Sequence, residues 1–222
     1  LDQATEIFQR LVTGPQTSLT DDARFALVIT RLNQHDAASA RSVLDALRLK
    51  RPTGTVAARI AYYDALLALG VDDEAGAQRL CEEPMERAPG TDEALEARLL
   101  IAELKARRRE PAREVMAWLG RMYASTGMTR GQRAKLAKRL GDFARSAQAY
   151  ADAIRWYQDA MELLPSLSGE AGYRVASCFE EGGDIDMAMQ RYQMIEQPPW
   201  HVRGQLALAK LLERAGRTAE AN

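Results

Sequence analysis

The 222-residue chain has few of the residues on which disulfide-rich, zinc-binding and membrane-spanning proteins depend. Its two cysteines, Cys81 and Cys178, are too few for a disulfide framework, and neither belongs to a Cys-x-x-Cys motif. All uninterrupted apolar runs are shorter than the ~18 residues that a membrane-spanning helix needs. We therefore expect two buried packing thiols, no metal site and no membrane span.

Catalytic constellations are also scarce. The only two histidines, His35 and His201, fall in an expected turn and at an expected helix start, where solvated or capping roles are typical. The segment Glu181-Gly182-Gly183-Asp184 fits a turn between two helices rather than a phosphate-binding loop. The acidic run at 72–74 suits a helix N-terminus, where it complements the helix dipole. We therefore predict no catalytic residue, no cofactor and no enzyme activity.

What the chain does have is a recurring alanine. Alanines fall at positions 4, 40, 77, 112, 153, 188 and 221, at intervals of 36, 37, 35, 41, 35 and 33 residues. Several are followed by an apolar residue four positions later and a proline twelve positions later. Three units show the full pattern: Ala40, Leu44 and Pro52; Ala77, Cys81 and Pro89; Ala153, Tyr157 and Pro165. Periods of this length are typical of repeat proteins.

The best unit is Leu140-Gly141, Ala153, Tyr157, Ala160 and Pro165, and it resembles the tetratricopeptide repeat (TPR), a helix–turn–helix unit of about 34 residues. The resemblance implies an all-α, right-handed α-solenoid of antiparallel helix pairs, a TPR-like superhelix. It covers residues 1–222 as a single solenoid of about six and a half units. The alternative is a non-repeating helical bundle, which does not explain the regular alanine spacing.

The same pattern predicts where the helices lie. We expect them at 2–13, 20–33, 36–50, 55–69, 73–87, 91–108, 111–124, 129–146, 149–163, 168–181, 184–196 and 201–215. Pro84 falls inside one of these ranges and predicts a kink or an early end there. The first and last units are incomplete, so we expect a segment of a longer array.

Charge is unevenly distributed although the net charge is only −1. Residues 105–145 contain twelve basic and three acidic residues, a local charge of +9, whereas residues 64–96 contain ten acidic and two basic residues, a local charge of −8. These stretches suit either solvated helix faces or, for the basic one, a patch that binds an acidic partner surface. Nucleic acid is not expected, because aromatic residues are not interleaved with the basic ones.

The TPR resemblance implies that the first helix of each unit lines a concave binding surface. Carried over position by position, this gives an apolar N-terminal part and a charged C-terminal part with Tyr173 as an exposed aromatic. The apolar residues of the N-terminal part are Phe25, Ile29, Leu32, Leu66, Leu69, Ala94, Ala97, Ile101 and Leu104, and the last helix contributes Arg203, Leu206, Lys210 and Glu213. The predicted partner-binding residues are Arg59, Tyr62, Lys135, Lys138, Asp142, Arg145, Tyr173 and Arg203.

The resemblance therefore implies a non-catalytic protein–protein interaction scaffold. Degenerate arrays rich in arginine and alanine resemble the periplasmic TPR scaffold regions of bacterial exopolysaccharide-export proteins, which gather enzymes beside an outer-membrane porin. On that interpretation the partners are proteins in exopolysaccharide secretion and the location is the periplasm. A cytoplasmic TPR assembly or regulatory adaptor is one alternative, and a groove that binds polysaccharide directly is another.

Overall fold

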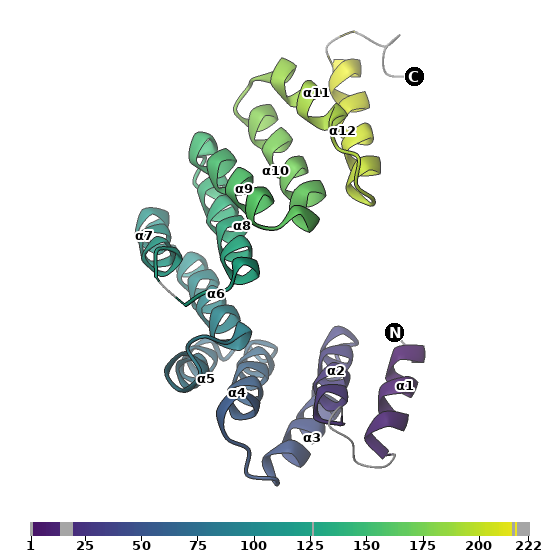
Figure 1. Ribbon diagram of the computed structural model, residues 1–222, viewed down its shortest axis with the longest axis vertical. Helices are drawn as coiled ribbons and strands as arrows, with labels where there is room; N and C mark the ends of the chain where they lie inside the picture. Colours follow the sequence, from purple (N-terminus) through teal and green to yellow (C-terminus); the bar gives the residue numbers. More distant parts are fainter. Residues whose placement is uncertain (1, 14–19, 126, 215, 217–222) are drawn as a thin grey trace. The chain divides into compact units, whose positions relative to one another are not determined.

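The computed structural model describes residues 2–13, 20–125, 127–214 and 216, and every regular element in them is helical (Figure 1). The chain forms two compact units, Leu1–Leu104 and Lys105–Asn222. Each is described by itself below, and the continuity of one solenoid over residues 1–222 stays a prediction. None of the described helices is long and apolar enough to cross a membrane.

The helices match those expected from the sequence to within about three residues. The N-terminal unit contains α1 (Asp2–Thr13), α2 (Thr20–Asn33), α3 (Ala37–Arg48), α4 (Gly54–Leu69), α5 (Glu74–Arg87) and most of α6 (Asp92–Arg107). The C-terminal unit contains α7 (Ala112–Tyr123), α8 (Arg130–Ser146), α9 (Tyr150–Leu163), a short 3-10 helix (Pro165–Leu167), α10 (Ser168–Glu181), α11 (Ile185–Gln193) and α12 (Trp200–Arg214).

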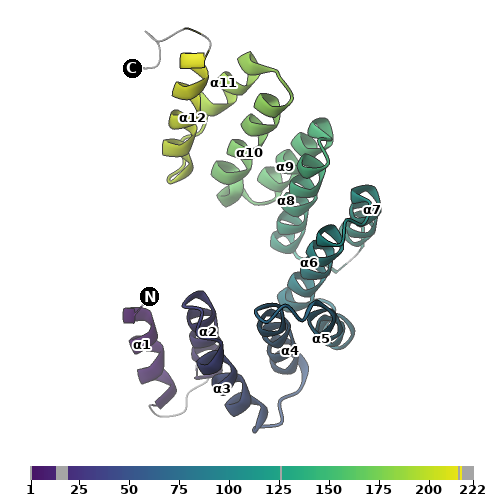
Figure 2. The ribbon, with the colours of Figure 1, turned by 180° about the vertical axis from the view of Figure 1, so that it is seen from behind.

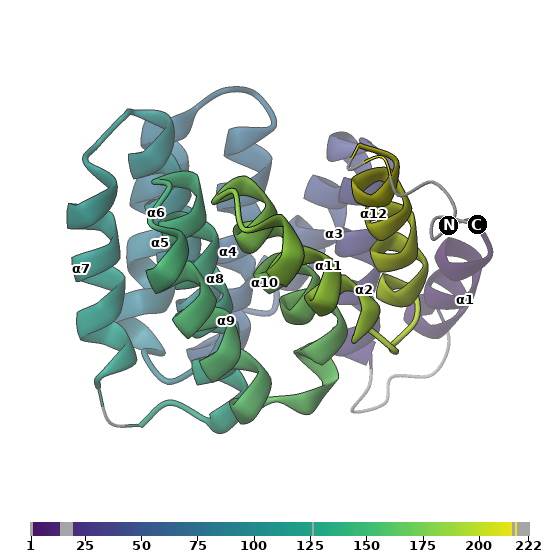
Figure 3. The same ribbon diagram turned by 90° about the horizontal axis from the view of Figure 1, so that it is seen from above.

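Consecutive helices pack as pairs. In the N-terminal unit α2 packs against α3 and α4 against α5 (Figure 2). In the C-terminal unit α8 packs against α9 and α10 against α11, and α9 also contacts α10 (Figure 3). We call α2, α4, α6, α8, α10 and α12 the first helices, and α3, α5, α7, α9 and α11 the second helices. This arrangement confirms the predicted all-α fold of stacked helix pairs.

The turn inside each pair has the same backbone geometry. One residue adopts a left-handed conformation with φ between 58° and 87°, and the next residue donates its N–H to the carbonyl five positions earlier, at 2.9–3.0 Å. The left-handed residues are His35, Asp72, Arg109, Gln148 and Gly183. This helix-ending hydrogen bond satisfies a carbonyl of the preceding helix. The repeat is thus regular in the backbone even where the side chains differ.

The alanines of the sequence pattern lie where helices touch. Ala40, Ala77, Ala153 and Ala188 are completely buried, and Ala112 is half-buried. Ala221 lies outside the described residues, and the side chain of Ala4 is not described. Because a methyl group allows close approach of two helix axes, these positions set the contact within each pair.

Gly141 explains the Leu-Gly motif of the best unit. A Cβ atom at this position would lie 2.6 Å from Cε1 of Tyr157, whose ring on α9 is completely buried. A glycine on α8 is therefore what lets the aromatic ring of α9 fill the space between the two helices.

The prolines behave in two ways. Pro52, Pro89 and Pro165 each follow the end of a second helix, as predicted from the missing N–H of proline. Of the predicted kink or early end at Pro84, the early end is wrong, because α5 continues through Pro84 to Arg87, and the kink stays a prediction. Pro84 is fully buried, so packing compensates for the hydrogen bond that its missing N–H cannot make.

Candidate functional site

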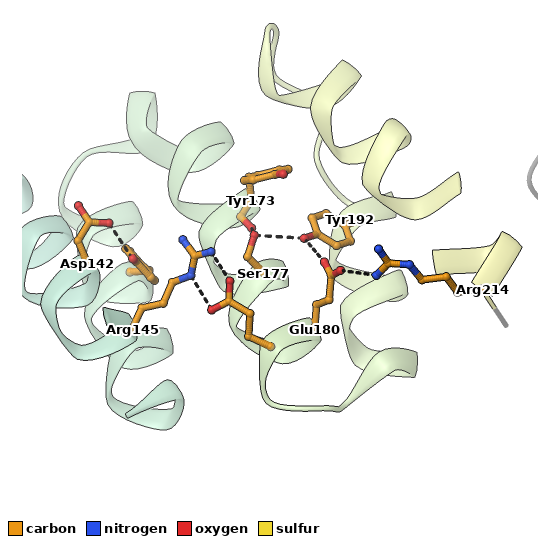
Figure 4. Close-up of polar contacts among 9 residues, drawn as sticks. Asp142, Arg145, Tyr173, Ser177, Glu180, Tyr192 and Arg214 are labelled. Atoms are coloured by element: carbon orange, nitrogen blue, oxygen red, sulfur yellow. Dashed lines mark hydrogen bonds and ion pairs between the residues drawn. The ribbon is translucent and has the colours of Figure 1, made fainter. Parts of the chain in front are cut away.

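The first helices of the C-terminal unit are joined by ion pairs (Figure 4). Lys138 Nζ on α8 lies 2.7 Å from Glu170 Oε1 on α10. Arg145 on α8 binds both carboxylate oxygens of Glu181 at the end of α10, and its Nε lies 3.0 Å from Oε2. Two predicted partner-binding cations thus already have carboxylate partners in the neighbouring pair.

The Arg145 pair is chemically strong for a surface interaction. The Arg145 side chain is three-quarters buried and its guanidinium donates two parallel hydrogen bonds. Donation to the Glu181 carboxylate is the main cause that raises the pKa of Arg145 above its usual value. A third pair joins α12 to α10, where the Arg214 and Glu180 side chains are 3.7 Å apart. We call the three pairs Lys138–Glu170, Arg145–Glu181 and Arg214–Glu180 the ion-pair ladder.

Buried tyrosines of the second helices reach the same surface. The Tyr157 hydroxyl donates to Asp142 Oδ1 at 2.8 Å, and the Tyr192 hydroxyl donates to Glu180 Oε2 at 2.8 Å and lies 3.1 Å from Ser177 Oγ. Burial raises the pKa of both tyrosines well above the usual value. Asp142, a predicted contact residue, is therefore an acceptor for the core aromatic of its own helix pair.

Tyr173 is not the exposed aromatic that the sequence predicted. It is half-buried, with its ring centroid 5.4 Å from that of Tyr192 and 5.5 Å from that of Trp200. The physical reason is that α12 brings Trp200 against α10. Arg203 is exposed and its guanidinium carbon lies 4.7 Å from the Trp200 ring centroid, a cation–π contact.

In the N-terminal unit, Arg59 has a similar structural environment. Its guanidinium pairs with Asp22 of α2 at 2.7 Å and with Glu93 of α6 at 3.1 Å, and it lies 4.0 Å above the Phe25 ring. Tyr62 is half-buried beside Tyr63, with ring centroids 5.5 Å apart, and burial raises its pKa. Arg59 therefore links three first helices, α2, α4 and α6.

The predicted apolar surface of the N-terminal unit is wrong at five positions. Phe25, Ala94, Ala97, Ile101 and Leu104 are buried and belong to the core. Of the nine apolar residues expected to line that part, only Ile29 is substantially exposed, at 42%, while Leu32, Leu66 and Leu69 are half-buried. The sequence placed these residues on the correct helices, but the side chains fill the space between helices instead of facing solvent.

All four predicted surface positions of α12 stay accessible: Arg203, Leu206, Lys210 and Glu213. Arg203 and Lys210 are exposed, Leu206 is 58% exposed, and the two cations make no ion pair with any residue that the structure describes. We call Arg203, Leu206 and Lys210 the α12 face. Lys135 on α8 is also exposed. A cation–apolar–cation surface beside an aromatic cluster can bind an acidic protein segment.

The remaining chemistry-bearing groups are dispersed. Both cysteines are buried as predicted, and burial raises the pKa of Cys81 to about 12 and that of Cys178 to about 11. His35 is exposed in its turn, and a ring nitrogen of His201 lies 2.7 Å from the Ile195 carbonyl oxygen. Among the residues described, no three His, Cys, Asp or Glu side chains are placed to bind a metal ion.

The basic stretch 105–145, which the sequence offered as a patch for an acidic partner, includes part of the second helix α7. This helix exposes Arg113, Ala117 and Arg121 beside a hollow of about 410 Å³. The four-residue spacing of these positions places them on one side of α7, whereas the TPR resemblance implies a binding surface on the first helices.

No protein-family model and no curated protein sequence matches the chain. Solved structures do. PilF of Pseudomonas aeruginosa is similar over 90% of this chain and 86% of its own, with a TM-score of 0.64 and 14% identity. BtubC from P. vanneervenii (99% and 83% covered, TM-score 0.45) and MamA of AMB-1 (92% and 87%, TM-score 0.36) are each 14% identical as well. Taken with the repeated turns and buried alanines, the similarity to PilF shows that this chain has the TPR-like α-solenoid fold.

Proposed function

We propose that this chain is a non-catalytic scaffold that binds partner proteins through its first helices. The observation that supports this most directly is the α12 face, where Arg203, Leu206 and Lys210 are exposed next to the Tyr173–Trp200 ring contact. Arginine and aromatic side chains dominate the binding energy of many protein interfaces. The partner segment is acidic, because the exposed cations Arg203 and Lys210 outnumber the one exposed carboxylate at the predicted positions of α12, Glu213.

The predicted residues then divide into two roles. Arg59, Lys138 and Arg145 pair with neighbouring first helices and hold the surface in shape, which lowers the conformational cost of binding. Arg203 and the edge of Tyr173 contact the partner. Tyr62 in the N-terminal unit, and Lys135 and Asp142 in the C-terminal unit, are further proposed contacts on first helices.

The test is affinity enrichment on the immobilised chain from an extract of the cells that produce it. We expect a set of proteins that the unaltered chain retains and that Arg203→Glu with Lys210→Glu releases, while circular dichroism stays helical. Arg41→Glu with Arg79→Glu is the matched control, because both residues are exposed on second helices and the charge change is identical. Identical protein sets for all three chains would refute the proposal.

For the biological setting, we propose that the partners belong to bacterial exopolysaccharide secretion and are met in the periplasm. The support is the resemblance of the degenerate, arginine-rich repeats to the scaffold regions of such export proteins. Fractionation of cells that produce the tagged full-length protein tests this. Recovery in the periplasmic fraction is expected, and recovery in the cytoplasm would favour an assembly or regulatory adaptor instead.

Direct polysaccharide binding is the competing function, because the Tyr173–Trp200 pair could stack on sugar rings. Calorimetry with oligosaccharides from the producing cells separates the two. No heat of binding is expected from a protein-directed scaffold, whereas saturable binding that Trp200→Ala abolishes would establish a glycan reader.

A further inference from the structure

A second surface with unpaired positive charge lies on α7, a second helix. Arg113 and Arg121 are exposed, and both lack an ion-pair partner among the described residues, as does Arg109 in the turn before the helix. Residues four apart lie on one side of a helix, so Arg113, Ala117 and Arg121 form a row. We call these three residues the α7 row.

Beside the row is a hollow of about 410 Å³. Val115, Ala117 and Trp118 give it an apolar lining, and Arg121 lies at its edge. Lys105, also at the hollow, is paired with Glu110 at 2.8 Å, so the unpaired charge comes from the arginines. Trp118 is half-buried and presents a large aromatic surface of the kind that anchors interface side chains.

The stretch of sequence that forms the hollow is positive, although the charges in the lining itself are balanced, Lys105 and Arg121 against Glu110 and Glu114. Residues 105–121 contain six basic residues against Glu110 and Glu114, a local charge of +4. An acidic ligand is therefore attracted and a basic one repelled. None of the three residues of the row is aromatic, and Trp118 beside it is only half-exposed. Successive nucleotide bases would therefore find no row of aromatic rings on which to stack, so a protein segment suits the α7 row better than a nucleic acid.

We propose that the α7 row binds an extended acidic segment of a partner protein, with one aliphatic or aromatic side chain inserted beside Trp118. This rests on the proposed protein-binding function but uses a different surface. Arg113 and Arg121 are eight residues apart on a helix, a separation of about 12 Å. In an extended chain, residues i and i+4 point to the same side and are about 13 Å apart. The segment recognised is therefore acidic–x–apolar–x–acidic.

Isothermal titration calorimetry on the full chain tests this with a synthetic peptide, Gly-Glu-Ser-Leu-Ser-Glu-Gly, capped at both ends. We expect saturable binding that weakens as salt is added, because the contacts are between exposed charges. Arg113→Glu with Arg121→Glu is expected to weaken binding at least tenfold. Trp118→Ala, or a peptide with serine in place of leucine, is expected to weaken it through the apolar contact.

Arg41→Glu with Arg79→Glu is the matched control, because both residues are exposed, belong to neither proposed binding surface and undergo the same charge change, and it is expected to bind the peptide unchanged. Absence of saturable binding, equal losses in the two charge-reversed chains, or tighter binding of single-stranded DNA than of the peptide would each overturn the proposal. Because the enrichment experiment tests the α12 face and this one tests the α7 row, failure of one is distinguishable from failure of the other.

Discussion

At the scale of single residues, contact within a helix pair depends on side chains small enough to admit a large neighbour. Gly141 faces the buried ring of Tyr157, and the completely buried Ala65 and Ala176 occupy the equivalent positions of two other pairs, twelve residues before Ala77 and Ala188. The hydroxyl of that tyrosine then reaches Asp142, so one aromatic side chain fills the core and also fixes a surface carboxylate. The small residue on the first helix and the aromatic residue on the second helix therefore depend on each other, because the ring fills the space that the small residue leaves.

The Gly141→Ala substitution is expected to destabilise the protein by about 1–3 kcal/mol, because a Cβ atom 2.6 Å from the Tyr157 ring forces that ring to move. Urea unfolding followed by circular dichroism measures the change. Gly120→Ala in α7 is the control, since a Cβ there meets nothing within 4 Å, and it is expected to stabilise by about 0.5–1 kcal/mol. Equal effects at both sites would contradict the packing argument.

At the scale of elements, the repeat is defined by its turns more than by its side chains. Five turns share one left-handed residue and one helix-ending hydrogen bond, yet only Gly183 is a glycine. A residue with a Cβ atom in this conformation costs about 1 kcal/mol relative to glycine. Asp36 and Asp73 compensate in two of these turns by accepting a hydrogen bond from the first turn of the next helix, and Asp184 makes the same cap after Gly183, where there is no such cost.

Gln148 occupies such a turn, and the residue after it, Ala149, provides no side-chain cap. Gln148→Gly is therefore expected to raise stability by about 0.5–1 kcal/mol, because it relieves the left-handed backbone without removing a contact in the core. Thermal unfolding checks this. Gln148→Ala keeps the Cβ atom and is expected to give no gain; a similar gain from alanine would show that backbone strain is not the cause.

At the scale of the whole molecule, both units contain buried cysteine thiols and tyrosine phenols, which burial keeps in their uncharged forms. Cys81 and Tyr62 lie in the N-terminal unit, and Cys178, Tyr157 and Tyr192 lie in the C-terminal unit. Burial raises the pKa of every one of them. The folded protein therefore favours the neutral thiol and phenol forms, while the unfolded chain can ionise them.

The pH dependence of stability follows from that difference. The stabilising contribution of these groups is complete below their unfolded pKa values, near 9.0 for the thiols and 10.0 for the phenols, and is lost as pH rises above them. We expect the urea midpoint to be constant from pH 7 to 8.5 and to fall above pH 9, with about 1 kcal/mol lost per buried thiol by pH 10. Cys81→Ala with Cys178→Ala should show a smaller decline between pH 9 and 10; an unchanged decline would exclude the thiols as its cause.

The fold could be predicted from the sequence more fully than the accessible residues of the candidate site. The alanine period, the Leu-Gly step and the terminal prolines were enough to predict the helices and their pairing, because each of these features acts through local backbone geometry or close packing within one unit. Pro84 was the local exception, since packing around a buried proline is not visible in the sequence.

The sequence by itself determined the all-α repeat, the turns and the first helices on which a binding surface would lie. The tertiary structure alone decided which side chains are accessible there: Arg59, Lys138 and Arg145 pair with residues 32 to 37 positions away, and Tyr173 packs against Trp200. The physical reason is that periodicity fixes the face of a helix, whereas the pairing of a charge depends on which distant carboxylate the fold brings within reach.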